Sequence, residues 1–366
     1  MRITTLMLAS LFFFSSCGSR VEEKSNSIHK FISDIPIDYK AVSGYDDLFT
    51  VELPDSAIHE GTSPSAVSCR GRIRGALCVL SSMPDTVPYD GKYQCMAGSD
   101  TYVRLFEDIH DSYPEAFQKM FCSVKHIFIL DRFFATAFAG LIKQPDSDKV
   151  IGAQIGIRKS LLDKPMSLAE WASWKEQISF GGNYESYELT QGLPYIQTSS
   201  NMPGFDLSYF VVTHEFGHIF DFANQLNRAD RKMDKNQKTS EYSDGTWGSI
   251  SWLSSDLPRP GDRFPYRRSL CFYSCNHEGM TKSAVKELYR GLSGSSFIST
   301  YAATSPTEEF ADIIAYYMLD KNGYSYILHT GQGESYDVMM KLGSMALAAK
   351  RQYITDFLSR TNIAYP

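Results

Sequence analysis

The chain of 366 residues has no block of like charge, no internal repeat and no low-complexity tract. Its formal net charge of −6 is spread along the sequence, so nothing predicts nucleic acid as a partner or attraction to an anionic membrane surface. Beyond the first residues, no segment is apolar for long enough to span a bilayer as a helix. The length and an ordinary hydrophobic share indicate a large core in one or two domains.

The first residues predict export. Arg2 is followed by an uncharged stretch from Ile3 to Phe14, and Ser16 then precedes Cys17 as in a bacterial lipobox. A positive start with a short apolar core is typical of a secretory signal, here residues 1–17. We expect Cys17 to become a lipidated N-terminus that tethers the protein to the membrane, with an ordinary cleaved signal as the alternative. Neither of the two residues after Cys17, Gly18 and Ser19, is Asp, which predicts an outer-membrane lipoprotein of the bacterial cell envelope, facing the periplasm or the surface.

Cysteine is sparse, but its number is informative. Setting Cys17 aside leaves Cys69, Cys78, Cys95, Cys122, Cys271 and Cys275. An even number in an exported chain predicts disulfides, although the sequence alone does not determine their pairing. Pairing by nearness along the chain suggests 69–78, 95–122 and 271–275. The alternative is a second zinc site with Cys271, Cys275 and His277 as partial ligands, which an oxidising compartment disfavours.

A segment without proline, from Leu207 to Leu226, contains H-E-x-x-H at residues 214–218. Apolar residues on nearly all sides predict a buried helix. Residues four apart on a helix share a face, so His214 and His218 can both bind one Zn²⁺ ion, while Glu215 lies beside them. Such an ion lowers the pKa of a bound water towards about 7, and Glu215 would take its proton as general base. The alternative is a pair of core histidines held by ordinary hydrogen bonds.

A third ligand has to come from elsewhere in the chain. In the extended pattern H-E-x-x-H-x-x-G-x-x-H, the Gly and third His positions are taken here by Asp221 and Asn224. The best candidate is Glu308, near the start of a second predicted helix that Ser305 caps. Asp312 follows one turn later on the same face, where it could orient a ligand histidine.

Two other interpretations of this helix start remain open. Glu308 lies three residues after Ser305, so it could be a capping-box residue and nothing more. Glu309 could be the ligand instead, although it lacks the partner that Glu308 has in Asp312.

The H-E-x-x-H motif with a downstream E-x-x-x-D/E helix resembles the gluzincin branch of zinc peptidases. The piece Tyr301-Ala, Glu308, Phe310-Ala311-Asp312 is similar to the anthrax lethal factor peptidase domain, although that family has Glu where Asp312 stands. The similarity covers about 207–226 and 301–319. It implies a zincin-like α+β fold with a mixed or antiparallel sheet, and Tyr301 as donor to the reaction's oxyanion, with His277 as runner-up.

Polar residues 18–60 predict a tether, 61–124 a Cys-containing helical region, and 125–366 the catalytic domain with a long insertion at 227–300. Aromatic residues in the insertion suit either a substrate-binding wall or packing within its own core. The expected strands are 126–130, 134–142, 149–157 and an edge strand at 193–198, which could hold a substrate backbone. The expected helices are 101–109, 116–121, 167–179 with a capping box of Ser167 and Glu170, and 335–358.

Together these features predict a zinc-dependent metallopeptidase acting on protein or peptide substrates. His214, His218 and Glu308 would hold one Zn²⁺ per chain. Two alternatives remain: a zinc amidase or endopeptidase acting on cell-wall peptides, and a non-catalytic surface-binding lipoprotein in which the motif is a coincidence.

Overall fold

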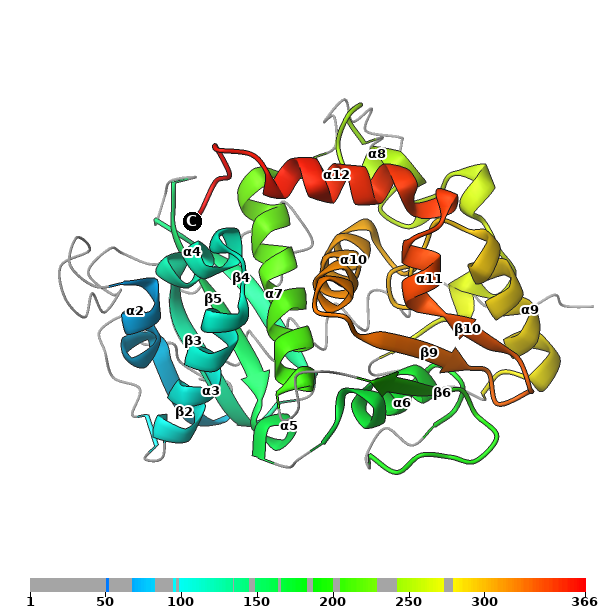
Figure 1. Cartoon of the computed structure of the whole chain (residues 1–366), viewed down its shortest axis with the longest axis horizontal. Helices are drawn as coiled ribbons and strands as arrows, with labels where there is room; N and C mark the ends of the chain where they lie inside the picture. The colour runs from blue at the N-terminus through cyan, green and yellow to red at the C-terminus, as the bar shows by residue number, and fades with distance from the viewer. Residues whose placement is uncertain are drawn as a thin grey trace, which may run out of the picture.

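The computed structural model describes residues 51–52, 68–82, 95–96, 99–133, 135–144, 149–163, 166–182, 187–199, 205–228, 242–272 and 279–366. The signal sequence with Cys17, most of the tether, Cys275 and His277 lie outside this part. Within it the chain is a mixed α+β structure, as predicted. The long helix α7 (Asp206–Asn224) runs through the middle, between a five-stranded sheet and the helix α10 (Pro306–Lys321) with a smaller sheet (Figure 1).

The larger sheet has the strand order β1-β4-β5-β3-β2. Its strands are β1 (Val51–Glu52), β2 (Leu77–Ser82), β3 (Val124–Arg132), β4 (Ala137–Lys143) and β5 (Val150–Arg158). Only β4 and β5 pair antiparallel, and the other neighbours pair parallel. The sheet is therefore mixed, and the strands expected at 126–130, 134–142 and 149–157 are confirmed.

Helices cover the face of this sheet that carries Leu77, Val79, Ile127 and Ile129. They are α2 (Cys69–Ala76), α3 (Ser99–Ser112), α4 (Glu115–Ser123) and α7. Because side chains alternate along a strand, the intervening residues point the other way. They form a smaller cluster that includes Cys78, Leu80, Phe128 and Leu130.

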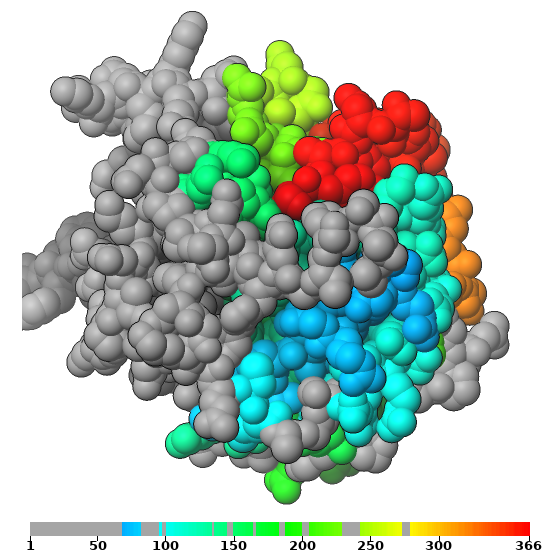
Figure 2. All heavy atoms as spheres, turned by 90° about the vertical axis from the view of Figure 1, so that its left-hand side faces the viewer, coloured from blue at the N-terminus to red at the C-terminus, as the bar shows by residue number. Residues whose placement is uncertain are grey.

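The predicted boundary between 124 and 125 is not a break in the packing. Strand β2, from the region expected to be helical, pairs in parallel with β3 across that boundary. One hydrophobic cluster also contains residues from both sides, from Ile73 to Ile363. Figure 2 shows the side of the molecule on which the blue segment at 68–82 lies against the cyan segments that follow it along the chain.

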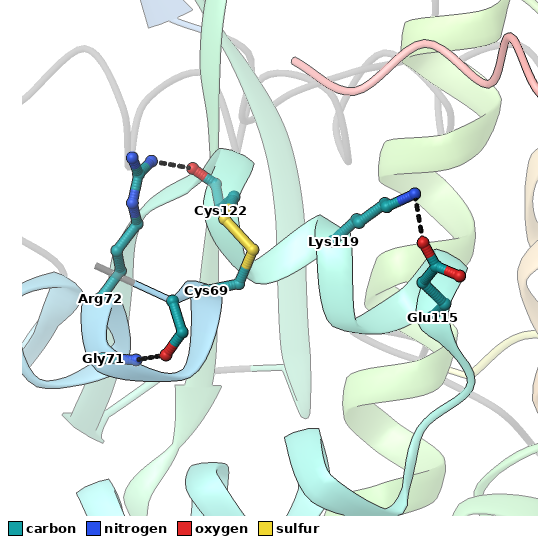
Figure 3. Close-up of a disulfide and its surroundings, with 7 residues drawn as sticks. Cys69, Gly71, Arg72, Glu115, Lys119 and Cys122 are labelled. Atoms are coloured by element: carbon teal, nitrogen blue, oxygen red, sulfur yellow. Dashed lines mark hydrogen bonds and ion pairs between the residues drawn. A yellow bond between two sulfur atoms is a disulfide. The ribbon is translucent and has the colours of Figure 1, made fainter. Parts of the chain in front are cut away.

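Two disulfides join Cys69 to Cys122 and Cys78 to Cys95, so the expected pairs 69–78 and 95–122 are wrong. Helix α2 packs on α4, which brings Cys69 to Cys122, where Arg72 also donates to the carbonyl of Cys122 (Figure 3). Cys271 is also disulfide-bonded, to a partner outside the described residues, and so is not a thiolate metal ligand. The disulfides indicate a protein outside the reducing cytoplasm.

The smaller sheet has the order β10-β9-β6, made of β6 (Tyr195–Ser199), β9 (Ser325–His329) and β10 (Ser335–Asp337). Strand β6 lies at its edge, as predicted for 193–198. It packs against α6 (Leu168–Ile178), which begins with the expected capping box of Ser167 and Glu170. Among the described residues, no helix meets the length and apolar character of a membrane span.

The single helix expected at 335–358 is wrong. This stretch begins with β10, continues as α11 (Val338–Leu342) and ends with α12 (Ala348–Leu358) after a 3₁₀ turn. Pairing with β9 holds the first residues extended, and the Asp337 side chain caps α11.

The remaining elements are α5 (Lys159–Asp163), α8 (Gly248–Ser251), β7 (Trp252–Ser254), β8 (Leu257–Pro258), two 3₁₀ turns (Pro260–Asp262 and Arg267–Ser269) and α9 (Lys282–Gly294).

Candidate metal centre

Helix α7 carries His214, Glu215 and His218 in the interior of the protein. The helix predicted at 207–226 is confirmed to within two residues at either end. His214 is 7% exposed and Glu215 is 5% exposed, because α7 is covered by α4 and the sheet on one side and by α10 on the other. The histidines lie one helical turn apart, and their ring centroids are separated by 4.8 Å.

The two histidines meet Glu308 of α10. The Nε2 atoms of His214 and His218 are 3.2 Å apart. Oε2 of Glu308 lies 3.2 Å from Nε2 of His214 and 3.4 Å from Nε2 of His218. These three atoms form a compact group that could hold a metal ion. The structure thus brings together the three residues expected as ligands from segments about ninety positions apart.

Glu308 and Glu309, at the start of α10, have side chains with different partners. Ser305 caps the helix by accepting a hydrogen bond from the backbone N–H of Glu308. The Glu308 carboxylate, however, faces the histidines. Glu309 points elsewhere: it is fully buried, pairs with the ammonium of Lys350, and accepts a hydrogen bond from Trp252 Nε1 at 2.8 Å. Glu309 is therefore not available as the ligand.

Asp312 holds His214 from the other side of its ring. Oδ1 of Asp312 lies 2.9 Å from Nδ1 of His214, while its Oδ2 accepts a hydrogen bond from Ser299. A carboxylate at Nδ1 favours the tautomer with its proton there, so that the lone pair of Nε2 faces Glu308 and His218. The orienting role expected for Asp312 agrees with this geometry.

The centre attracts positive charge. Burial lowers the pKa of His214, but the carboxylates of Asp312 and Glu308 outweigh it and raise that pKa to about 9. Burial works against ionisation of Glu308 as well, yet both histidines hold its pKa well below the usual range. The Nε2 lone pairs of His214 and His218 and the carboxylate of Glu308 face one another. They are stable together only with a cation between them, either a proton or a metal ion.

Glu215 shares the interior with this group but is not one of the three clustered residues. Burial raises the pKa of its carboxyl, while the nearby charges of His214 and His218 lower it. Among the described residues it has no hydrogen-bond partner. A buried carboxylate with a raised pKa is a stronger base than one in water.

Tyr301 lies next to the group formed by His214, His218 and Glu308. Its ring centroid is 5.8 Å from that of His214, and Phe272 contacts the ring edge-on at 4.8 Å. This contact brings one aromatic residue of the insertion to the centre. Trp247 and Trp252, by contrast, are buried in the core.

The two residues at the extended-motif positions have structural contacts instead of a metal-binding role. Asp221 is fully buried and accepts hydrogen bonds from the backbone N–H and the side-chain amide of Asn227, at 3.0 and 2.6 Å. Asn224 donates to the carbonyls of Phe220 and Ala364. Together they fasten the end of α7.

Sequence reasoning missed the buried pair Lys175 and Glu176 of α6, each 8% exposed. Both reach towards Thr300 and Tyr301, the residues that precede α10 by a few positions. No sequence signal marks them, because a Lys-Glu pair in a helix is usually a solvated face.

Comparison with protein families, curated proteins and solved structures found no match to this chain.

Proposed function

We propose that this protein is a zinc-dependent metallopeptidase. The observation that carries the proposal is the mutual spacing of 3.2, 3.2 and 3.4 Å between the two Nε2 atoms and Oε2 of Glu308. A tetrahedral zinc site with bonds of about 2.0–2.1 Å separates its ligand atoms by about 3.3 Å. Two imidazoles and one carboxylate are also the donor set of catalytic zinc sites that keep a position open.

When bound, the zinc ion would act as a Lewis acid and make water a competent nucleophile near neutral pH. His214, His218 and Glu308 would hold the ion, and Asp312 would keep the Nε2 lone pair of His214 directed at it. Glu215 would take a proton from the attacking water at its carboxylate and pass it to the leaving amine. Tyr301 would donate its phenolic hydrogen to the oxygen that becomes negatively charged.

Peptide hydrolysis is favoured over a bare metal-storage role by Glu215. A storage site needs ligands only, whereas this one has, directly after the first ligand, a buried carboxylate with no hydrogen bond from any residue that the structure describes. Burying such a group costs free energy of folding, and groups of this kind are concentrated at functional sites. Edge strand β6 does not support this choice, because Ser173 of α6 already bonds the backbone N–H and carbonyl of Ile196.

The test measures metal and turnover on the same preparations. The soluble chain beginning after Cys17 is purified without added metal or chelator, and zinc per chain is determined by elemental mass spectrometry. Hydrolysis is followed with a mixed library of quenched fluorescent peptides, and in parallel with purified peptidoglycan. We expect about one zinc per chain and peptide hydrolysis that a chelator abolishes.

The Glu215→Gln variant separates the metal site from the chemistry. It should keep zinc and lose at least 10²-fold of turnover, since it removes the base and no ligand. Zinc-free protein that dialysis against zinc does not restore would leave the surface-binding lipoprotein as the better interpretation. Cleavage of peptidoglycan alone would favour the cell-wall amidase or endopeptidase.

We also propose that the protein reaches the cell envelope as a lipoprotein anchored at Cys17. The disulfides support export but do not bear on the anchor. A Cys17→Ser variant of the full chain should be released from membranes into the soluble fraction. An unchanged membrane fraction would remove Cys17 from the anchoring.

A further inference from the structure

The ammonium of Lys175 is buried against aromatic rings. Its Nζ lies 3.3 Å from the centroid of the Tyr301 ring, 5.1 Å from that of Trp171 and 6.0 Å from that of Phe272. The residue is 8% exposed and donates no hydrogen bond to any residue that the structure describes. The nearest of these rings is that of Tyr301, whose electron density attracts a cation. The carboxylates of Asp312, Glu308, Glu176 and Glu215 also favour the charged form of Lys175.

Glu176, the next residue of α6, accepts a hydrogen bond from Thr300, the residue before Tyr301. The hydroxyl of Thr300 donates to the Glu176 carboxylate and lies 2.8 Å from each of its oxygens. Tyr289 donates to the same carboxylate at 2.6 Å, which fixes it from α9. Glu176 is as buried as Lys175, so these contacts are shielded from water.

A third contact completes the attachment of the turn before α10. Ser299 donates to Asp312, the residue that also contacts His214, and accepts a hydrogen bond from the backbone N–H of Ala302 at 2.8 Å. Ser299 is thus bound to Asp312 of α10 and Thr300 to Glu176. The ring of Tyr301 contacts Lys175. The Tyr301 ring is thereby held beside His214.

We propose that Lys175 and Glu176 are positioning residues that hold Tyr301 for catalysis, and that Lys175 strengthens the Tyr301 hydroxyl as a hydrogen-bond donor. This inference rests on the proposed function, in which Tyr301 donates to the oxyanion. A cation over the ring favours negative charge developing on the phenolic oxygen, as happens when that hydroxyl donates to an oxyanion. The effect belongs to the transition state, so it acts on kcat and leaves KM nearly unchanged.

A different use of a buried ammonium makes the opposite prediction. Lys175 could bind an anionic group of the substrate directly, since it has no hydrogen-bond acceptor among the described residues. Its removal would then raise KM and leave kcat in place. The split between the two constants therefore decides between positioning Tyr301 and binding substrate.

The kinetic test uses the chain beginning after Cys17, loaded with zinc, and the best peptide from the quenched fluorescent library. Lys175→Met should lower kcat by about 10- to 100-fold, the range of one oxyanion donor or less. Zinc should stay near one per chain, and KM should change less than about threefold. Lys175→Arg, which keeps the cation, should recover most of the lost kcat.

A second background shows whether Lys175 acts through the Tyr301 hydroxyl. In Tyr301→Phe the ring remains but the donor is gone, so adding Lys175→Met should cost less than about threefold in kcat. An equal loss in both backgrounds, a raised KM at constant kcat, or loss of zinc from Lys175→Met would each overturn the proposal. The matched control is Lys321→Met, which removes a lysine 5.1 Å from the ring centroid of Tyr317 and should leave kcat unchanged.

A stability measurement tests the positioning contact without any turnover. In metal-free protein, the urea midpoints of Lys175→Met, Tyr301→Leu and the double variant are compared with wild type. The double variant should shift by clearly less than the two single shifts added together. Additive shifts would overturn the positioning contact. Coupled shifts in a protein that binds zinc but hydrolyses no peptide would keep the contact and reject the proposed function instead.

Glu176 is tested in the same way. Glu176→Gln keeps an acceptor for Thr300, whereas Glu176→Ala removes it. We expect Glu176→Gln to retain most of the wild-type kcat, and Glu176→Ala to lose kcat in the Tyr301 background but not in Tyr301→Phe. If both variants keep full kcat, the Thr300 contact does not position Tyr301.

Discussion

Gly217 of α7 lies directly against Ala311 of α10. A Cβ atom on Gly217 would be 2.7 Å from the Cα of Ala311 and 2.8 Å from Cγ2 of Ile314. Only a residue without a side chain permits this approach. Gly217 immediately precedes the ligand His218, and Ala311 lies between Glu308 and Asp312. The close approach of the two backbones is therefore what allows the carboxylates of α10 to reach the histidines.

We expect Gly217→Ala to weaken both the fold and the metal site. The new methyl group meets backbone, which cannot turn away, so α10 has to move, at a cost of about 1–3 kcal/mol in the free energy of unfolding. Urea unfolding in chelator and zinc affinity by competition with a dye would measure the two effects. The control is Gly75→Ala in helix α2, where nothing lies within 4 Å of the added methyl; it should be neutral or slightly stabilising.

The neighbouring glutamates of α10 should give opposite phenotypes. Glu308→Gln removes a ligand and should weaken zinc binding by at least tenfold while the fold persists. Glu309→Gln should keep zinc but lower the free energy of unfolding by about 3 kcal/mol or more, because it leaves the ammonium of Lys350 buried without its counter-charge. Zinc content and urea unfolding on both variants give the comparison. Equal zinc affinity in the two would remove Glu308 from the ligand set.

Asp312→Asn tests the orientation of His214. The amide cannot supply the negative charge that now lies 2.9 Å from Nδ1 of His214. Loss of such a partner typically weakens metal affinity by about 10- to 100-fold. We expect that range in a zinc competition assay, with near-normal zinc content at saturating metal. Ser299→Ala, which removes only the donor to the other carboxylate oxygen, should have a smaller effect.

Asp221 should make the fold less stable as pH rises from about 4 to about 7. Burial raises the pKa of this carboxyl to about 7 in the folded state, against an ordinary value of 3.8, although hydrogen bonds from Asn227 oppose the rise. At pH values between 3.8 and about 7, Asp221 is therefore protonated in the folded state and ionised in the unfolded state. The contribution is complete below about pH 4 and is lost as pH rises through about 7.

The measurement for Asp221 is urea unfolding in chelator at pH 5 and at pH 8. Wild type should lose on the order of 2–3 kcal/mol more than Asp221→Asn over this interval, because the variant has no proton to release. Chelator excludes zinc loss as the cause. Parallel pH profiles for the two proteins would show that Asp221 ionises normally.

The sequence alone determined the features that depend on residues close together along the chain. The helical period placed His214 and His218 on one face, and Ser167 with Glu170 formed the capping box that its spacing predicts. Strands rich in β-branched residues were found where they were expected. Each of these features involves residues no more than a few positions apart, and their local conformational preferences are enough to produce it.

Only the tertiary structure decided which distant groups meet. The choice between Glu308 and Glu309 depended on which one faces α7 and which one faces Lys350. Disulfide pairing followed the packing of α2 on α4 and not nearness along the chain. Strand pairing with β9 likewise converted the start of the expected C-terminal helix into β10. The burial of Lys175 against Tyr301 had no local signal at all, because whether a charged residue is solvated or enclosed is set by what the rest of the chain packs around it.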